Sequence, residues 1–384
     1  MQYAIVEEIA NSNTRKGFQI NFFGDPNQAI YGSLGGVAKS LQMINEEFVD
    51  LQFKEQTLSG CFRSTGRIVT YYKEFMVEKY PIDAKGVLKD DNGIIQYNDQ
   101  IGKEQLYDYI AQIIEKNISD GIPEEEICVV APVWDLLYPF SKDLQDRLPN
   151  VKFDAPDITP IKRDPMNIFY KLSRLLLTEP NIRQLTYRRK LANEIIEEIG
   201  LMTGLPLAIE GLDLLNFIIQ AKGFDTKGSK FVLNGIKYVF DAIQCRIDDH
   251  VELKKMYDDF VEKMESRLHN EKFQLTDDLN TFKRMFKEKE GVVINTCHGV
   301  KGEEYQTVIA FGLVYGKVPS IYTECTKMDE EANKLLYVIA SRAKSRLYLF
   351  SEKGRLYKDT GLKKDVEAFP TRQLAQNKSV EYDM

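Results

Sequence analysis

The sequence predicts an α/β protein with a parallel sheet that is interrupted by an all-helical insertion. Three observations lead to this fold class. Short apolar segments alternate with amphipathic helices between residues 94 and 177, which is typical of parallel β-α-β units. Helical periodicity with almost no strand pattern then fills residues 179–289. An apolar strand resumes at Val292.

Length and composition indicate a soluble globular protein of more than one domain. A chain of 384 residues exceeds the size of one ordinary core, so two or three domains are expected. Hydrophobic residues make up 43% and charged residues 28%, as in globular proteins. No apolar run approaches the roughly 20 residues that span a bilayer, and the acidic start lacks a signal peptide. We therefore expect a cytoplasmic protein without a membrane partner.

The cysteine content and the charge bear on two kinds of site, metal sites and nucleic-acid-binding sites. The five cysteines lie far apart and only three histidines are present, so no metal site is predicted within this chain. The net charge of −7 does not exclude nucleic acid, because phosphate recognition depends on where basic residues cluster. Basic runs occur at residues 183–190 and 283–289; each is interpreted as a solvated helix face more readily than as a DNA track.

The individual elements follow from periodicity and turn residues. Expected strands are short apolar segments bounded by Gly, Pro, Asp or Asn, and they lie at residues 3–6, 19–23, 94–97, 127–133, 151–153, 292–294, 307–311 and 347–350. Expected helices show apolar residues at helical spacing, and they lie at residues 68–76, 103–118, 139–148, 167–177, 191–199, 212–222, 231–247, 251–268, 277–287 and 330–344. In the last helix a buried middle is expected, with Glu331 and Arg342 exposed at its ends. The polar tail from Tyr357 is expected to fray.

Residues 292–305, VVINTCHGVKGEEY, form the segment around which the chain is organised. An apolar strand ends in hydroxyl, imidazole and a glycine-flanked lysine, and a second apolar run follows. This arrangement is typical of a ligand loop at the carboxyl edge of a sheet. The alternative is a surface loop that joins two core strands.

Two earlier segments carry further candidate residues. Residues 24–31, GDPNQAIY, place Asp25 and Gln28 just past an expected strand, where a phosphate or metal would be met. Residues 58–65, LSGCFRST, precede an amphipathic helix, and Arg63 is a candidate phosphate sensor beside its start.

Taken together, four segments resemble motifs of UvrD/Rep-type superfamily 1 DNA helicases, in the family's order. Thr296, His298, Lys301, Gly302, Glu304 and Tyr305 fill T-x-H-x-x-K-G-x-E-[FY], and residues 24–31 fill G-D-x-x-Q-x-I-Y. Residues 58–64 are similar to L-x-x-N-Y-R-S, with Cys61 in place of asparagine. Residues 330–343 are similar to E-E-x-R-x-L-x-Y-V-x-x-T-R-A, with Ser341 in place of threonine. In size the chain is nearer to the small Gabija-type helicases.

The resemblance implies a RecA-like P-loop NTPase fold. Residues 1–50 would be a remnant of the first lobe, residues 51–178 and 290–384 the second lobe, and residues 179–289 a helical insertion that contacts duplex DNA. The implied cofactors are ATP and Mg²⁺. The implied partner is DNA, single-stranded or at a duplex junction. A protein such as a nuclease is a further candidate partner.

The resemblance also implies roles for single residues. Planar guanidiniums suit the charge that spreads over the γ-phosphoryl oxygens in ATP hydrolysis. The implied catalytic residues are Gln28, Arg63 and Arg342. The implied nucleotide-binding residues are Phe62, which stacks on the base, Glu304, which bonds the ribose, and Gly302 and Asp25. The implied DNA-binding residues are Tyr31, Thr296 and His298.

The sequence also departs from the family. No G-x-x-x-x-G-K-[ST] loop is present, and that loop supplies the amide cradle, lysine and Mg²⁺-binding hydroxyl for a triphosphate. The D-E-x-Q-D segment is at most an eroded remnant at residues 6–13, which leaves Glu7 and Glu8 as metal candidates. Ser33 and Leu34 stand where the family often has a DNA-holding aromatic and arginine.

Two functions therefore remain open. The first is an ATP-dependent DNA helicase or translocase, 3′→5′ by resemblance, whose phosphate loop is truncated, lost or supplied in trans. The second is a catalytically inactive helicase relic that acts as a DNA- or protein-binding regulatory module. The DNA structure recognised, the oligomeric state and the pathway, repair or phage defence, also remain open.

Overall fold

The computed structural model describes residues 6, 8–9, 19–30, 39–48, 51, 53–155, 159–180, 184–221, 223, 225–271, 275–286, 290–359 and 364–375. The chain forms two compact units, Met1–Leu137 with Asn295–Met384, and Tyr138–Ile294. This finding does not test the boundaries expected from the sequence, so the division into a lobe remnant, a second lobe and an insertion stays a prediction.

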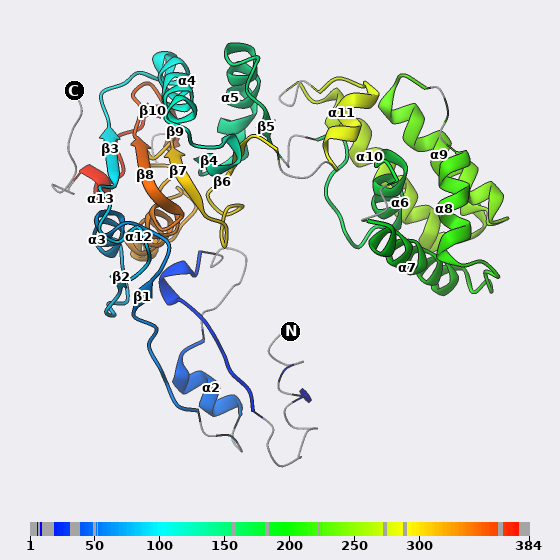
Figure 1. Ribbon diagram of the computed structural model, residues 1–384, viewed down its shortest axis with the longest axis horizontal. Helices are drawn as coiled ribbons and strands as arrows, with labels where there is room; N and C mark the ends of the chain where they lie inside the picture. Colours follow the sequence, from blue (N-terminus) through cyan, green and yellow to red (C-terminus); the bar gives the residue numbers. More distant parts are fainter. Residues whose placement is uncertain are drawn as a thin grey trace. The chain divides into compact units, whose positions relative to one another are not determined.

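A six-stranded parallel sheet with the order β3-β8-β7-β4-β6-β5 confirms the α/β fold class (Figure 1). Its strands are β3 (Ile94–Asn98), β4 (Ile127–Ala131), β5 (Phe153–Asp154), β6 (Val292–Thr296), β7 (Tyr305–Ala310) and β8 (Ala343–Phe350). Every residue of β4 is buried. An interior strand of a parallel sheet is covered on both faces, which explains why this segment is continuously apolar.

Helices cover the sheet within the first unit. Helices α3 (Gly66–Lys73) and α12 (Met328–Ala340) pack on strands β7, β8 and β3. Helix α4 (Lys103–Ser119) is fastened to β7 by the buried Asn117, whose Oδ1 accepts a hydrogen bond of 2.7 Å from Thr307. Helix α5 (Trp134–Arg147) begins earlier than expected and contains Pro139. The 3₁₀ turns η3 (Glu124–Glu126) and η6 (Cys325–Lys327) precede β4 and α12.

The first strands expected from the sequence are wrong where the structure describes them. Residues 19–25 contain no strand, and the 3₁₀ turn η1 (Pro26–Gln28) follows them. Residues 3–5 lie outside the described part, and Val6 is helical. A strand needs a hydrogen-bonding neighbour, and apolar composition does not supply one. Here Phe22 instead joins an aromatic cluster with Phe48 and Phe53, beside helix α2 (Leu41–Glu47).

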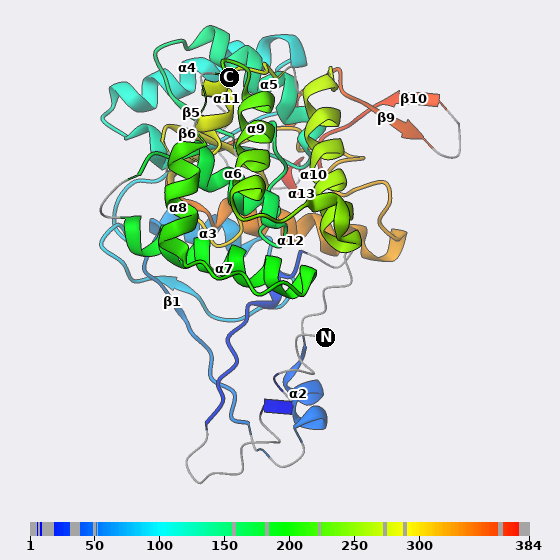
Figure 2. The ribbon, with the colours of Figure 1, turned by 90° about the vertical axis from the view of Figure 1, so that its right-hand side faces the viewer.

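The C-terminal segment is more ordered than the sequence suggested. Strands β9 (Leu356–Asp359) and β10 (Lys364–Glu367) form an antiparallel hairpin, which Figure 2 shows projecting at the right of the view. Helix α13 (Arg372–Ala375) follows. Tyr315 anchors the base of the hairpin, because its ring stacks on Phe369 and meets Tyr357 edge-on. The expectation of a fraying tail from Tyr357 is therefore wrong for the described residues.

The second unit is mostly helical, as the periodicity predicted. Its complete helices are α6 (Ile168–Leu177), α7 (Leu185–Thr203), α8 (Gly211–Gln220), α9 (Gly228–Ala242), α10 (Val251–His269) and α11 (Leu279–Arg284), with the 3₁₀ turn η5 (Ile247–Asp249). They enclose one apolar core. Arg188, within the first basic run, is buried because its guanidinium caps the carboxyl end of α6 at Leu175 and Thr178. That run is therefore not entirely a solvated face.

Candidate functional site

The first unit brings together side chains from four distant segments. Gln28 belongs to η1, and Arg63 lies between strand β1 (Gly60–Cys61) and helix α3. Strand β2 (Asp83–Ala84) pairs with β1 in parallel. Glu304 directly precedes β7, and Arg342 lies between α12 and β8. These are the residues that the sequence assigned to catalysis and ribose binding, and the fold places them in one polar cluster.

Arg63 forms an ion pair with Glu304. Its Nε donates to the Glu304 carboxylate, and its Nη1 donates to the carbonyl of Ser341 at 2.9 Å. Lys344 approaches the other carboxylate oxygen of Glu304 at 3.6 Å. The hydrogen bond from Arg63 is the main cause that lowers the pKa of Glu304 below its ordinary value. Both side chains of the pair keep substantial solvent exposure, so a ligand can reach them.

Arg342 is buried, with 2% of its surface exposed, so the expectation that it is exposed at a helix end is wrong. The chain turns sharply after α12, and the guanidinium folds back onto it, with Nε donating to the carbonyl of Val338 at 3.2 Å. Nη1 donates to the carbonyl of Glu303 at 3.0 Å. Burial, and then the positive charge of Arg63, lower the pKa of Arg342 to about 10. The guanidinium therefore remains charged at neutral pH.

Gln28 connects Arg342 to Asp25. Arg342 Nη2 lies 3.5 Å from Gln28 Oε1, while Gln28 Nε2 donates to Asp25 at 2.8 Å. The carboxylate also accepts from Tyr80 at 2.9 Å, from Tyr337 at 3.2 Å and from the backbone amide of Asn27 at 3.0 Å. Burial raises the pKa of both phenols, with the Asp25 charge as a further cause. Asp25 is thus the centre of a donor shell and the counter-charge of Arg342.

Asn27 is a residue whose importance sequence reasoning missed. It is fully buried, and its Oδ1 accepts from the backbone amides of Val77 and Glu78 at 2.8 and 3.0 Å. Its Nδ2 donates to the carbonyl of Glu78 at 2.9 Å. The carboxamide therefore clamps η1 to the loop after α3. The only signal in the sequence was an amide-bearing residue at an unspecified position of the G-D-x-x-Q-x-I-Y motif.

Phe62 and Gly302 are two further expected nucleotide contacts, and the structure shows the exposure of the first and the backbone conformation of the second. The Phe62 ring is 72% exposed, which leaves a face free for stacking. Its backbone is tightly held, since a Cβ on Gly86 would come within 2.0 Å of the Phe62 carbonyl oxygen. Gly302 has φ of +93° and open space around it. A turn with positive φ is a conformational reason for glycine at this position.

Two of the three expected DNA contacts lie near the end of β6, Thr296 as its last residue and His298 in the loop that follows. Thr296 Oγ1 accepts from the backbone amide of Gly299 at 3.1 Å and so shapes the turn. His298 is half-buried, and its Nε2 lies 3.3 Å from the carbonyl of Ile30. Burial lowers the pKa of His298, so a neutral ring is expected at pH 7. Tyr31 and Glu7 lie outside the described residues. Glu8 is exposed and helical.

The donor chemistry of this cluster suits a phosphate more than a metal. Arg63 and Arg342 carry planar guanidinium donors of the kind that fit phosphate oxygens. Among the described residues, no group of three or more His, Cys, Asp or Glu is arranged to hold a metal ion.

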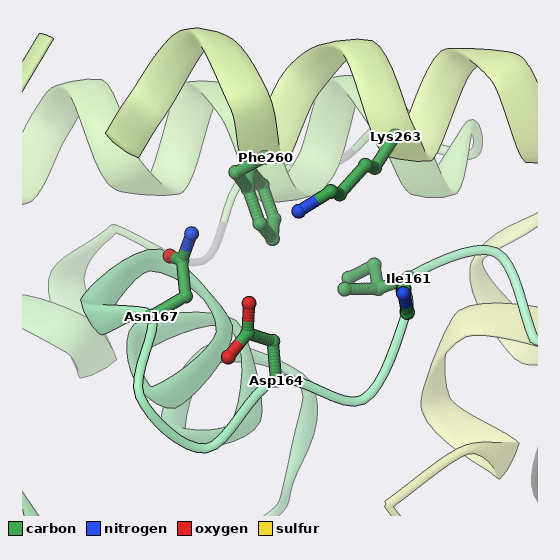
Figure 3. Close-up of a pocket in the computed structure, with 6 residues that line it drawn as sticks. Ile161, Asp164, Asn167, Phe260 and Lys263 are labelled. Atoms are coloured by element: carbon green, nitrogen blue, oxygen red, sulfur yellow. The ribbon is translucent and has the colours of Figure 1, made fainter. Parts of the chain in front are cut away.

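A separate hollow in the helical unit is lined by Ile161, Lys162, Asp164, Asn167, Phe260 and Lys263 (Figure 3). Its polar groups are already engaged. Asn167 caps helix α6 by accepting from the amides of Phe169 and Tyr170, and Lys263 is paired with Asp259. The hollow contains none of the residues that the sequence analysis singled out.

Part of the chain matches a known protein family. Residues 230–354 match the UvrD-like helicase C-terminal domain. The matched range contains Thr296, His298, Glu304 and Arg342, whereas Gln28 and Arg63 lie before it. Comparison with curated proteins gave no match. The described helices include none that is long and apolar enough to cross a membrane. The parallel sheet is consistent with the RecA-like fold of that domain, and the match supports a UvrD-like helicase C-terminal part within residues 230–354.

Proposed function

We propose that this chain supplies the two arginines of the nucleotide site, Arg63 and Arg342, of an ATP-dependent DNA helicase or translocase. The observation that carries the proposal is the convergence of Arg63, Glu304, Gln28 and Arg342 from separate segments on one cluster. Glu304 and Asp25 compensate the charges of Arg63 and Arg342, yet the charge of Arg63 is, after burial, the next cause that lowers the pKa of Arg342. A polyphosphate anion beside both guanidiniums would relieve this repulsion.

Each residue has a distinct part in this proposal. ATP, when bound, supplies the phosphoanhydride bond that is cleaved. Arg342, held in place by the carbonyls of Glu303 and Val338, stabilises charge that develops on the γ-phosphoryl oxygens. Arg63 is more exposed and exchanges its bond with Glu304 for a phosphate contact. Glu304 then accepts from the ribose, and Lys344 keeps its carboxylate neutralised.

The remaining expectations belong to the same proposal. Phe62 stacks on the base, and Thr296 and His298 face a DNA strand at the carboxyl edge of the sheet. Residues 1–50 act as a remnant of the first lobe, and residues 179–289 as a helical insertion that contacts DNA. A phosphate loop and Mg²⁺ ligands come from outside the described residues, with a nuclease as one possible protein partner. We place this activity in the cytoplasm, with movement 3′→5′.

ATP hydrolysis by two preparations tests the proposal. The purified 384-residue chain should hydrolyse ATP negligibly with or without DNA, because its sequence has no phosphate loop. The chain isolated from its native source with its bound proteins should show DNA-stimulated hydrolysis. Arg63→Ala and Arg342→Ala should each lower that rate by about a hundredfold or more, as removal of one transition-state donor does.

Arg67→Ala is the matched control, because its guanidinium bonds the carbonyl of Gly93 and lies outside the cluster. This variant should keep the full rate. DNA-stimulated hydrolysis that survives Arg342→Ala would contradict the proposed role of that residue. Hydrolysis by the purified chain alone, lost in Arg342→Ala, would show instead that these 384 residues form a complete site.

The alternative is a non-catalytic helicase relic that binds DNA or protein as a regulatory module. The observation that favours it is the absence of a G-x-x-x-x-G-K-[ST] loop from the sequence. This alternative expects DNA or protein binding that is indifferent to ATP and unchanged in Arg63→Ala. DNA affinity measured by fluorescence anisotropy, with and without a non-hydrolysable ATP analogue, separates the two functions.

A further inference from the structure

Tyr80 lies outside every segment that the sequence analysis singled out, yet its hydroxyl reaches the centre of the cluster. It belongs to the loop between α3 and β2. Its phenol oxygen is 2.9 Å from Asp25 Oδ1 and 3.0 Å from the hydroxyl of Tyr337. Tyr337 in turn lies 3.2 Å from Asp25 Oδ2. The two hydroxyls and the Asp25 carboxylate thus form a closed triangle of short contacts.

A count of protons assigns the donors in this triangle. Each phenol has one proton, so only two of the three contacts can be hydrogen bonds at the same time. An ionised carboxylate only accepts, and hydrogen bonds to it are the stronger ones. The shortest contact therefore assigns the Tyr80 proton to Asp25. Tyr337 donates either to Asp25 or to the oxygen of Tyr80.

The same reasoning fixes the orientation of the Gln28 carboxamide. Its two neighbours are the acceptor Asp25 and the donor Arg342. Nε2 must therefore face Asp25, and Oε1 must face the guanidinium, because the reverse orientation would oppose acceptor to acceptor and donor to donor. Gln28 thus presents its oxygen to Arg342, while its nearer N–H group is engaged by Asp25.

We propose that Tyr80 is a positioning residue for Arg342, acting through Asp25 and Gln28. Its hydroxyl holds the Asp25 carboxylate in place, and Asp25 fixes the Gln28 amide. The Gln28 oxygen, at 3.5 Å, then orients Nη2 of the guanidinium together with the Ser341 hydroxyl, which accepts from Nη2 at 2.9 Å. Asn27 holds the same turn in place through its hydrogen bonds to the loop that carries Tyr80. The inference rests on the proposed function only for the importance of Arg342, because every contact of the relay lies within the chain itself.

Solvent exchange of the Arg342 side-chain N–H protons tests the relay directly. The full chain is labelled with nitrogen-15 arginine, and the Arg342 signals are assigned by their loss in Arg342→Lys. Tyr80→Phe keeps the ring and removes only the hydroxyl. It should shift these signals and speed their exchange by about tenfold, since a hydrogen bond to a charged group is lost. Asp25→Asn should give a similar change.

Tyr322→Phe is the matched control, because that ring is 91% exposed and takes no part in the relay; it should leave the Arg342 signals unchanged. The decisive comparison uses Gln28→Met, which removes both amide groups. In that background Tyr80→Phe should have no further effect on the Arg342 signals. An equal effect in both backgrounds, or no effect in the native background, would overturn the relay. Neither measurement uses ATP, so failure of the relay is distinct from failure of the proposed ATP-dependent function.

Discussion

Arg63 and Glu304 form an ion pair although 241 positions separate them in the chain. Arg63 also donates to the carbonyl of Ser341, the residue before Arg342. One side chain thus links the start of α3, the loop before β7 and the end of α12. This junction therefore joins three of the segments that resemble helicase motifs.

The ion pair predicts a pH dependence of stability. The pKa of Glu304 is lowered from its ordinary value of 4.5, chiefly by the hydrogen bond from Arg63. The stability that the ion pair contributes should be fully present above about pH 5 and lost as pH falls through the lowered pKa of Glu304. Because both side chains are partly exposed, Glu304→Gln should cost less than about 1 kcal/mol at pH 7. Urea denaturation at pH 7 and at a series of pH values below 4.5 should show that this cost shrinks as the pH falls. Glu125→Gln, on an exposed turn, serves as the control, and an equal loss at all of these pH values would contradict the assignment.

The Asn27 clamp predicts a local loss of protection. Asn27→Ala leaves the amides of Val77 and Glu78 without the acceptor they share in the native chain. Exchange of these two amides should become at least about tenfold faster, and stability should fall by about 1–3 kcal/mol. Hydrogen–deuterium exchange followed by NMR measures both amides. Asn45→Ala, an exposed position on α2, should change neither, and unchanged protection in Asn27→Ala would rule out the clamp.

Phe62 should matter for binding and not for folding. Its ring is 72% exposed, so Phe62→Ala should change stability by no more than about 0.5 kcal/mol. Loss of one base–aromatic stack should weaken nucleotide binding by about tenfold in the preparation that hydrolyses ATP. Calorimetry and thermal unfolding separate the two effects.

Phe369→Ala is the contrasting variant. The Phe369 ring stacks on Tyr315 with the ring centroids 4.6 Å apart, so this change should destabilise the hairpin by about 1 kcal/mol. A large stability loss in Phe62→Ala would argue for a packing role.

Gly86 should be intolerant of any side chain. A Cβ there would lie 2.0 Å from the Phe62 carbonyl oxygen, a backbone atom that cannot rotate away. Gly86→Ala should therefore cost about 1–3 kcal/mol and displace the segment that carries Phe62 and Arg63. At Gly24 no atom lies within 4 Å of an added Cβ, so Gly24→Ala should be tolerated. Denaturant unfolding of the two variants makes the comparison, and equal stabilities would show that the backbone at Phe62 yields.

The elements that were predicted well are those whose burial is visible in a short window. Strand β3 and helices α4, α6 and α10 lie within one or two residues of their expected bounds, because each presents an apolar face at its own period. The strand expected at residues 19–23 and the fraying tail were wrong for the same reason. Whether an apolar or polar segment becomes a strand depends on a pairing partner, near as in the β9–β10 hairpin or far along the chain, which the pattern of the segment itself does not report.

The sequence by itself determined the fold class, the resemblance to UvrD-like helicases and the identity of the charged residues at the site. It could do so because these depend on residue type and on spacing within single segments. Only the tertiary structure decided that Arg342 is buried, that Arg63 meets Glu304, and that Asn27 and Tyr80 support the cluster. Burial and hydrogen bonding are properties of the surroundings of a side chain, and here those surroundings come from segments separated by 50 to more than 300 residues.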